Sequence, residues 1–189
     1  MDTYLTGTLA GAGSFRCRDC GFAVALNALD EIPQCPHCGN ESFARASIFA
    51  TDTGDALPPF DGEDDDSTWV EAAKEDIGEP GDYLAYKDET QVCVLPLTQE
   101  CTRIGRSLTA DIRFDDPTVS RRHAIIVRQD AGVRVLDDRS LNGVFLNGER
   151  VEWGELSDGD ELIVGRYRLH FLTSEEAAEP AGLSAAHAA

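Results

Sequence analysis

The sequence predicts an all-β protein, in which a β-sandwich follows a small cysteine-bearing unit and an acidic linker. From about Gly81 onward, short apolar segments alternate with turn residues, a pattern typical of sandwiches and barrels. Residues 50–82 hold twelve carboxylates and one lysine, and such a stretch buries little apolar surface. Two Cys-x-x-Cys pairs precede it. We therefore expect four regions: a cysteine-bearing unit at 1–49, a disordered acidic linker at 50–81, a sandwich domain at 82–173 and a disordered tail at 174–189.

The net charge of the chain, −19 over 189 residues, is concentrated in the linker. Nonspecific binding to nucleic acid or to an anionic membrane needs clustered positive charge, so both are disfavoured. No segment has the roughly 18 consecutive apolar residues of a membrane span. The N-terminal residues lack the basic and apolar regions of a signal peptide. We expect a cytoplasmic protein with reduced cysteines.

Four of the six cysteines have the spacing of zinc ligands, in the pairs Cys17/Cys20 and Cys35/Cys38. Two residues between paired cysteines let one tight turn present both thiolates to the same ion. The segment resembles a zinc ribbon. With all four positions filled by protein, one zinc ion would be structural rather than catalytic, contributing on the order of 10 kcal/mol to folding. The unit carries only three arginines and five carboxylates, which favours a structural or protein-binding role over nucleic-acid binding.

The second half of the chain contains nine predicted strands, each short and bounded by turn residues. Asn147-Gly148 predicts a two-residue hairpin, because both positions of that turn require positive φ. The predicted strands are Tyr83–Lys87, Gln91–Leu97, Thr102–Ile104, Asp111–Phe114, His123–Val127, Val133–Leu136, Val144–Leu146, Glu161–Val164 and Tyr167–Leu172.

Three polar clusters lie at the ends of these strands. Arg106 follows one strand, Ser120 and Arg121 precede another, and Ser140 and Asn142 precede a third. Arginine offers a planar fork of donors that suits phosphate, and hydroxyl and amide groups add directional hydrogen bonds. Because loops at one end of a sandwich are neighbours in space, the clusters predict a single anion-binding site.

These motifs resemble the forkhead-associated (FHA) domain in order and spacing, over roughly residues 82–173. The resemblance rests on Gly105-Arg106, Ser120-x-x-His123, Asn142-Gly143, Asn147-Gly148 and Asp158-Gly159-Asp160. It implies an eleven-stranded β-sandwich that binds phosphothreonine peptides through loops at one end.

The resemblance also implies a role for each residue of the site. Arg106 and Ser120 would hold the phosphate, Arg121 would contact the phosphate or the peptide backbone, and Asn142 would bind the peptide main chain. Leu141 stands where many members have threonine, so the hydroxyl of Ser140 becomes the candidate to assist the phosphate.

Several of these residues also have a purely structural interpretation. Asn142 could simply shape the turn with Gly143, and Arg122 could form a surface salt bridge. The family likeness favours a buried hydrogen-bonding role for His123.

The resulting hypothesis is a phosphothreonine-peptide-binding adaptor in Ser/Thr kinase signalling, with a phosphorylated protein and a kinase as partners and no catalytic activity. The alternatives are a nucleic-acid-associated regulator that binds through the ribbon, a metal-dependent enzyme, and a domain that has lost phosphate binding. A further hypothesis concerns Thr68, which follows acidic residues and precedes Trp69-Val70. Phosphorylated by a kinase, Thr68 would fold back onto the FHA pocket and block outside partners.

Overall fold

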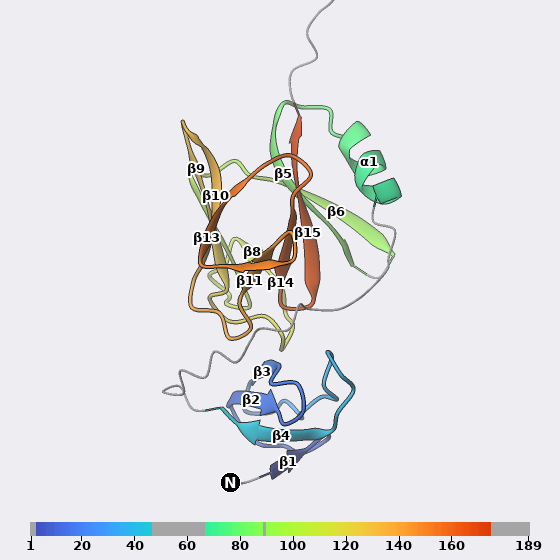
Figure 1. Ribbon diagram of the computed structural model, residues 1–189, viewed down its shortest axis with the longest axis vertical. Coiled ribbons are helices and arrows are strands. Elements are labelled where there is room, and N and C mark those ends of the chain that lie inside the picture. Colours follow the sequence, from blue (N-terminus) through green and yellow to red (C-terminus); the bar gives the residue numbers. More distant parts are fainter. Residues whose placement is uncertain (1–2, 47–66, 89, 175–189) are drawn as a thin grey trace, which may run out of the picture.

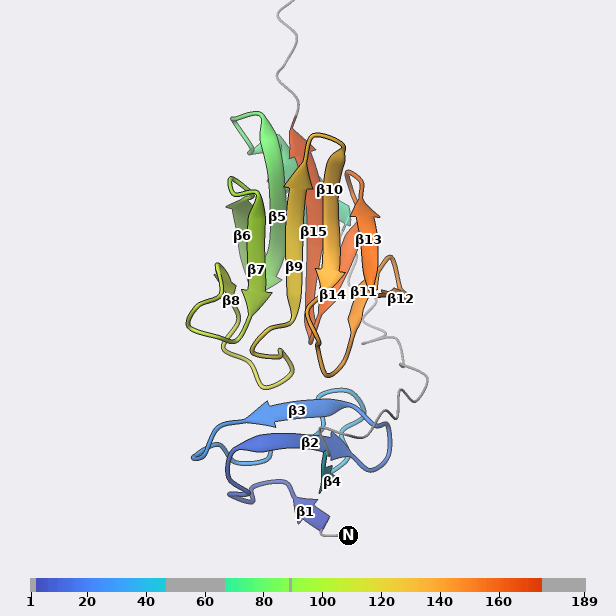
Figure 2. The ribbon, with the colours of Figure 1, turned by 90° about the vertical axis from the view of Figure 1, so that its left-hand side faces the viewer.

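Two bodies of β-structure, a small ribbon and a larger sandwich, make up the computed structural model, which describes residues 3–46, 67–88 and 90–174 (Figure 1). The ribbon spans residues 3–46 and lies against one end of the sandwich (Figure 2).

The ribbon is a four-stranded antiparallel sheet in the order β1-β4-β2-β3, which leaves β3 at an edge. Its strands are β1 (Thr3–Leu5), β2 (Gly13–Cys17), β3 (Ala23–Leu26) and β4 (Ser42–Arg45). Its small core consists of Phe15, Val24, Leu26, Ile32 and Phe43, with Cys17 and Cys35.

The sandwich consists of eleven strands in two sheets, β13-β10-β9-β7-β8 and β12-β11-β14-β15-β5-β6. Its strand pairs are antiparallel, except that β7 and β8 are parallel. The strands are β5 (Gly81–Asp88), β6 (Gln91–Pro96), β7 (Cys101–Gly105), β8 (Ile112–Arg113), β9 (Ala124–Gln129), β10 (Gly132–Asp137), β11 (Val144–Leu146), β12 (Glu149–Val151), β13 (Trp153–Leu156), β14 (Glu161–Val164) and β15 (Tyr167–Ser174).

The sandwich core lies between the two sheets, because apolar residues of both inner faces meet there. Along β9, for example, Ala124 and Ile126 are buried while Ile125 and Val127 are only partly so. The core is centred on the fully buried side chains Leu84, Ile126, Leu162, Leu169 and Phe171.

The predicted sandwich of eleven strands is confirmed, and each of the nine strands predicted from the sequence is present in it. The Asn147-Gly148 hairpin is also confirmed: it joins β11 to β12, with φ of 51° and 83° at the two residues. The strands β12 and β13 were not predicted.

The expectation of a disordered linker over 50–81 is wrong for its last part. Residues Ser67–Glu75 form the helix α1, which packs beside β15 and β6 at the end of the sandwich away from the ribbon (Figure 1). Gly81 and Ser174, placed outside the sandwich by the sequence, pair with each other in β5 and β15. Residues 50–66 and 175–189 lie outside the described residues.

The helix α1 has nine residues. Among the described residues, no helix has the length and apolar character needed to cross a membrane.

Candidate functional site

Three loops converge at the end of the sandwich that faces the ribbon (Figure 2). They are residues 106–111 after β7, residues 114–123 between β8 and β9, and residues 138–143 between β10 and β11. We call these three segments the loop face. It contains all five residues predicted to bind a phosphopeptide.

Gly105 brings the first two loops together. The backbone N–H of Arg106 donates to the carbonyl of Ser120 at 2.9 Å, and that of Ser107 donates to Arg121 at 3.1 Å. A Cβ atom at Gly105 would lie 2.4 Å from the carbonyl oxygen of Arg121, which is too close for any side chain. Glycine at this position therefore fixes Arg106 beside Ser120 and Arg121.

His123 links the second and third loops from inside the domain. Its Nδ1 accepts the backbone N–H of Ser120 at 3.0 Å, so its Nε2–H donates to the carbonyl of Gly143 at 3.1 Å. Burial lowers the pKa of His123 to about 4, because the charged imidazolium would lose its hydration. The ring is thus a neutral strut, as the sequence analysis favoured.

The two serines of the site differ in how their hydroxyls are used. The Ser120 hydroxyl oxygen accepts the backbone N–H of Leu141 at 2.9 Å, which leaves its proton available to a ligand. The Ser140 hydroxyl donates to Asp137 at 2.9 Å and accepts the backbone N–H of Gly143 at 2.8 Å. The hydroxyl proton of Ser140 is therefore committed to shaping the turn.

Asn142 uses both ends of its amide on a strand of the ribbon. Its Oδ1 accepts the backbone N–H of Ala23 at 2.8 Å, and its Nδ2 donates to the carbonyl of the same residue at 2.9 Å. The second Nδ2 proton goes to the carbonyl of Thr118 at 3.1 Å, which anchors the side chain to the loop face. The Asn142 side chain thus binds both the N–H and the carbonyl of one residue in an extended chain.

Arg106 binds the same segment of the ribbon. Its guanidinium donates to the carbonyl of Ala25 and, from Nη2, to the carboxylate of Asp30 at 2.9 Å. A longer contact of 3.4 Å joins its Nε to Asp115. The hydrogen bond from the Asn27 N–H and the contact with Arg106 hold the pKa of Asp30 below its usual value. The Arg106 side chain is only 11% exposed, so this contact is largely shielded from water.

The remaining arginines of the loop face are on its surface. Arg121 is exposed and has no ion pair within the described part of the chain. Arg122 forms a two-pronged salt bridge with Asp138, as its structural interpretation required. Thr68 lies in α1, away from the loop face, so the structure does not bring this predicted phosphorylation site to Arg106 (Figure 1).

The four cysteines of the ribbon form a cluster suited to a metal ion. Their sulfur atoms all lie within 4.8 Å of one another, with Cys17 and Cys38 3.6 Å apart and Cys20 and Cys35 3.5 Å apart. A tetrahedral ion with bonds of about 2.3 Å holds its sulfurs about 3.8 Å apart, so the residues fit a four-thiolate site.

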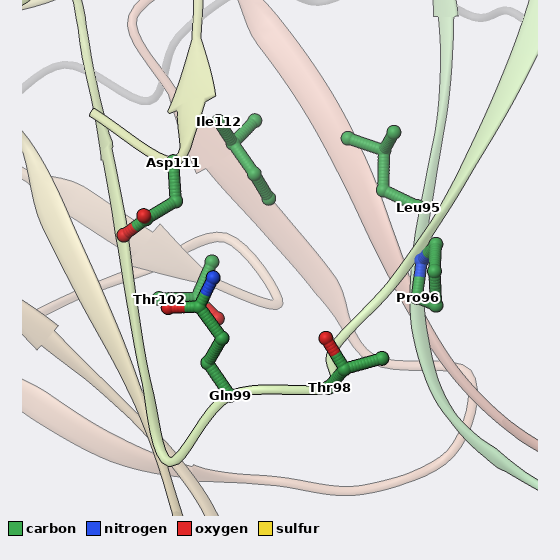
Figure 3. Close-up of a pocket in the computed structure, with 7 residues that line it drawn as sticks. All are labelled: Leu95, Pro96, Thr98, Gln99, Thr102, Asp111 and Ile112. Atoms are coloured by element: carbon green, nitrogen blue, oxygen red, sulfur yellow. The ribbon is translucent and has the colours of Figure 1, made fainter. Parts of the chain in front are cut away.

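A small hollow of about 150 Å³ lies between β6 and the β7–β8 edge, and Asp111 is the one lining residue that it shares with the loop face (Figure 3). It contains none of the predicted site residues, and its carboxylate, Asp111, accepts the backbone N–H of Arg103 at 2.8 Å. Its lining residues are Leu95, Pro96, Thr98, Gln99, Thr102, Asp111 and Ile112.

The partners of Arg106 and Asn142 were not predicted from the sequence. Ala23 and Ala25 read only as strand residues, and Asp30 is one of 35 acidic residues in the chain. The small side chains of Ala23 and Ala25 are compatible with a close approach of backbones, but this signal is weak on its own.

Comparisons with known proteins find a family match for part of each body. The FHA domain family matches residues 102–165, and a family described as a zinc-ribbon containing domain matches residues 1–47. The first match contains all five predicted phosphopeptide-binding residues, and the second contains all four cysteines of the predicted zinc site.

Curated relatives match the FHA region. Glycogen accumulation regulator GarA of Mycobacterium tuberculosis is 43% identical over 86 residues, which cover 46% of this chain and 53% of the relative. Oxoglutarate dehydrogenase inhibitor of Corynebacterium jeikeium is 45% identical over 82 residues, covering 43% of this chain and 57% of the relative. The chain thus spans about half the length of the curated relatives it matches.

Among solved structures, that of Mycobacterium tuberculosis EmbR in complex with a low-affinity phosphopeptide aligns with a TM-score of 0.47 and 30% identity. The alignment covers 59% of this chain and 30% of that one.

Proposed function

We propose that this chain, which carries an FHA domain behind a zinc-ribbon domain, is a cytoplasmic phosphothreonine-peptide-binding adaptor in Ser/Thr kinase signalling. The names of its relatives, a regulator and an inhibitor of an enzyme, agree with a regulatory role. The division into a ribbon at 1–49 and an FHA domain at about 82–173 is part of the proposal.

One observation carries the proposal: the loop face holds an extended backbone and an anion at the same time. Asn142 binds both backbone groups of Ala23, while Arg106 binds the carboxylate of Asp30. A phosphopeptide presents the same two features, an extended main chain and a negatively charged group.

In a phosphopeptide complex, Arg106 and Arg121 would supply positive charge and Ser120 would donate its hydroxyl proton to the phosphate. Asn142 would set the register of the main chain. Ser140, whose hydroxyl proton is given to Asp137, would act by holding the turn that positions Asn142. Each charge-assisted hydrogen bond is worth about 1.5–3 kcal/mol, and a few of them give an affinity of about micromolar order after the cost of association.

The proposed adaptor is not an enzyme. Ser120 and His123 are neighbours, but the imidazole accepts the backbone N–H of Ser120 and does not receive its hydroxyl proton. A serine nucleophile would need a base in contact with its hydroxyl.

We assign one structural zinc ion to the ribbon, held by Cys17, Cys20, Cys35 and Cys38. Four thiolates fill a tetrahedral site and leave no open position for a substrate.

The alternative of nucleic-acid binding by the ribbon is not favoured. The guanidinium groups of Arg16, Arg18 and Arg45 each donate a hydrogen bond within the ribbon itself.

Arg121 and Arg122 provide a matched test of the proposed site. Both are exposed neighbours with the same charge, but only Arg122 is held by a carboxylate. We expect Arg121→Ala to weaken binding of a phosphothreonine peptide by about tenfold, the loss of one charge-assisted contact, and Arg122→Ala to change it less than twofold. Titration calorimetry with the phosphorylated and unphosphorylated peptide measures both. Equal binding of the two peptides, or equal effects of the two variants, would contradict the proposal.

Phosphorylation of Thr68 remains a hypothesis about regulation. Thr68 is the second residue of α1, so at least the first turn of the helix would have to open before a kinase could bind it. Mass spectrometry of wild type and Thr68→Ala after incubation with a Ser/Thr kinase tests it, and equal phosphorylation of both would exclude Thr68.

A further inference from the structure

The edge strand of the ribbon is hydrogen-bonded to the loop face along its free side. Ala23 and Ala25 are the alternate residues of β3 whose backbone groups point away from β2, and all four of those groups have partners on the sandwich. The Ala23 N–H and carbonyl bind Asn142. The Ala25 N–H donates to the carbonyl of Pro117 at 2.7 Å, and the Ala25 carbonyl accepts from Arg106.

The geometry points to β3 and Asp30 as an intramolecular ligand of the FHA domain, which a phosphopeptide must displace to bind. We propose that the zinc ribbon in this way occupies the peptide site without any phosphorylation. This inference rests on the proposed function, since it takes Arg106 and Asn142 as peptide-binding residues.

The exposed edge of a sheet is a ready template for pairing with another chain. Peptide-binding domains use the same backbone groups when they hold an extended peptide. The loop face binds β3 in the same way as such a peptide. Side chains and one carbonyl of the loops, rather than a second strand, form hydrogen bonds with the backbone groups on the free side of β3. The free edge of the ribbon is covered by the contact that fills the FHA site.

Asp30 occupies the anion position with a weaker group than phosphate. Its carboxylate carries one negative charge and contacts Arg106, while the Ser120 hydroxyl instead accepts the Leu141 N–H and Arg121 stays exposed. Phosphothreonine carries close to two charges and three acceptor oxygens. It can therefore engage donors that Asp30 leaves unused, which allows a phosphopeptide to replace the ribbon.

Such a contact lowers the apparent affinity of the domain for phosphopeptides. If only a fraction of molecules has the loop face open, the apparent dissociation constant is the intrinsic one divided by that fraction. Weakening the ribbon contact should therefore tighten phosphopeptide binding, although no residue of the FHA domain is changed.

Asp30→Asn tests this in the full-length protein. The amide oxygen can still accept the Asn27 N–H that Asp30 Oδ2 now accepts at 2.7 Å, so the turn is kept while the ion pair with Arg106 is lost. We expect Asp30→Asn to bind a phosphothreonine peptide about tenfold more tightly than wild type, as the open fraction rises. The matched control is Glu31→Gln, which removes the same charge from an exposed neighbour that has no ion pair within the described residues.

Hydrogen exchange of the backbone amides supplies a second measurement that does not depend on affinity. In wild type without peptide, the amides of Ala23 and Ala25 should exchange slowly, and adding the phosphothreonine peptide should speed their exchange. Val24, which pairs with Phe15 inside the ribbon, should stay protected throughout and shows that the ribbon remains folded.

The two measurements separate the possible failures. Equal peptide affinity of wild type and Asp30→Asn, with no peptide effect on Ala23 and Ala25, would overturn the competition and leave phosphopeptide binding intact. Absence of phosphopeptide binding to all three proteins would overturn the proposed function and, with it, the competition. Tighter binding by Glu31→Gln equal to that of Asp30→Asn would reduce the effect to net charge and overturn the role of Asp30.

Discussion

The ribbon and the sandwich are each stabilised by a different kind of interaction. Among the described residues, the ribbon core contains seven buried side chains, two of them cysteines, whereas the sandwich core contains sixteen. A core as small as that of the ribbon does not stabilise a fold by itself, so the proposed zinc ion would supply the difference. The stability of the sandwich thus comes from its own apolar core, whereas that of the ribbon depends on the proposed metal ion.

Metal removal is expected to have the largest effect, because it should act on the ribbon and not on the sandwich. A chelator takes away about 10 kcal/mol of metal-binding free energy, so we expect the ribbon to unfold while the sandwich stays folded. The chain has two tryptophans, Trp69 and Trp153, and both lie outside the ribbon. Their fluorescence should stay native-like after chelation, while the amides of β2 and β3 lose protection from hydrogen exchange.

Adding zinc back is the control, and it should restore the protection of the ribbon amides. Loss of the native tryptophan signal on chelation would contradict the independence of the two bodies. If the ribbon keeps its protection without metal, its core is sufficient and the zinc assignment has no structural consequence.

The second prediction concerns the buried histidine of the sandwich. Unfolded His123 has a pKa near 6.5, while burial lowers the folded value to about 4. Between these values the unfolded chain binds a proton that the folded chain does not. The contribution of His123 to the free energy of unfolding is thus complete above pH 6.5 and falls by about 3 kcal/mol in total as the pH drops to 4.

Urea unfolding of wild type and His123→Asn from pH 7 to 4, followed by tryptophan fluorescence, isolates this contribution, because the carboxylates titrate in both proteins. We expect the variant to be less stable at pH 7, since it loses the link between Ser120 and Gly143, and to lose less stability on acidification. Parallel pH profiles of the two proteins would show that His123 is not held neutral by the fold.

How far the sequence predicted the fold depended on local patterning. Strands such as β11 and β14 were predicted with their observed bounds, because they are short apolar runs between turn residues. The missed strand β12 is largely exposed, and β13 contains Gly154 and an exposed Trp153, so neither has an apolar pattern. The helix α1 was missed because the acidity of its surroundings outweighed its own composition.

The site was predictable where it is built from local motifs and not where it joins two domains. The sequence analysis predicted that Arg106, Ser120 and Asn142 lie at one end of the sandwich, and in the structure they lie in neighbouring loops. No pattern connects Asp30 to Arg106, because that pairing depends on how one folded body docks on another.

The smallest predicted effect concerns α1, the second element attached to the sandwich. The ribbon is attached through backbone groups and a largely shielded arginine. The helix is attached through an exposed ion pair between Lys74 and Asp158 and an edge-to-face contact of Trp69 with His170, with ring centroids 5.2 Å apart. Exposed ion pairs contribute less than about 1 kcal/mol, so Lys74→Ala should speed hydrogen exchange of the α1 amides by no more than about fivefold.

Lys87→Ala is the matched control, since Lys87 is exposed, has no ion pair within the described residues and is the only other lysine. It should leave exchange in α1 unchanged. An increase of a hundredfold or more in Lys74→Ala would mean that the ion pair holds the helix in place. The access of a kinase to Thr68 would then depend on that single contact, because Thr68 lies in the first turn of the helix that Lys74 anchors at its other end.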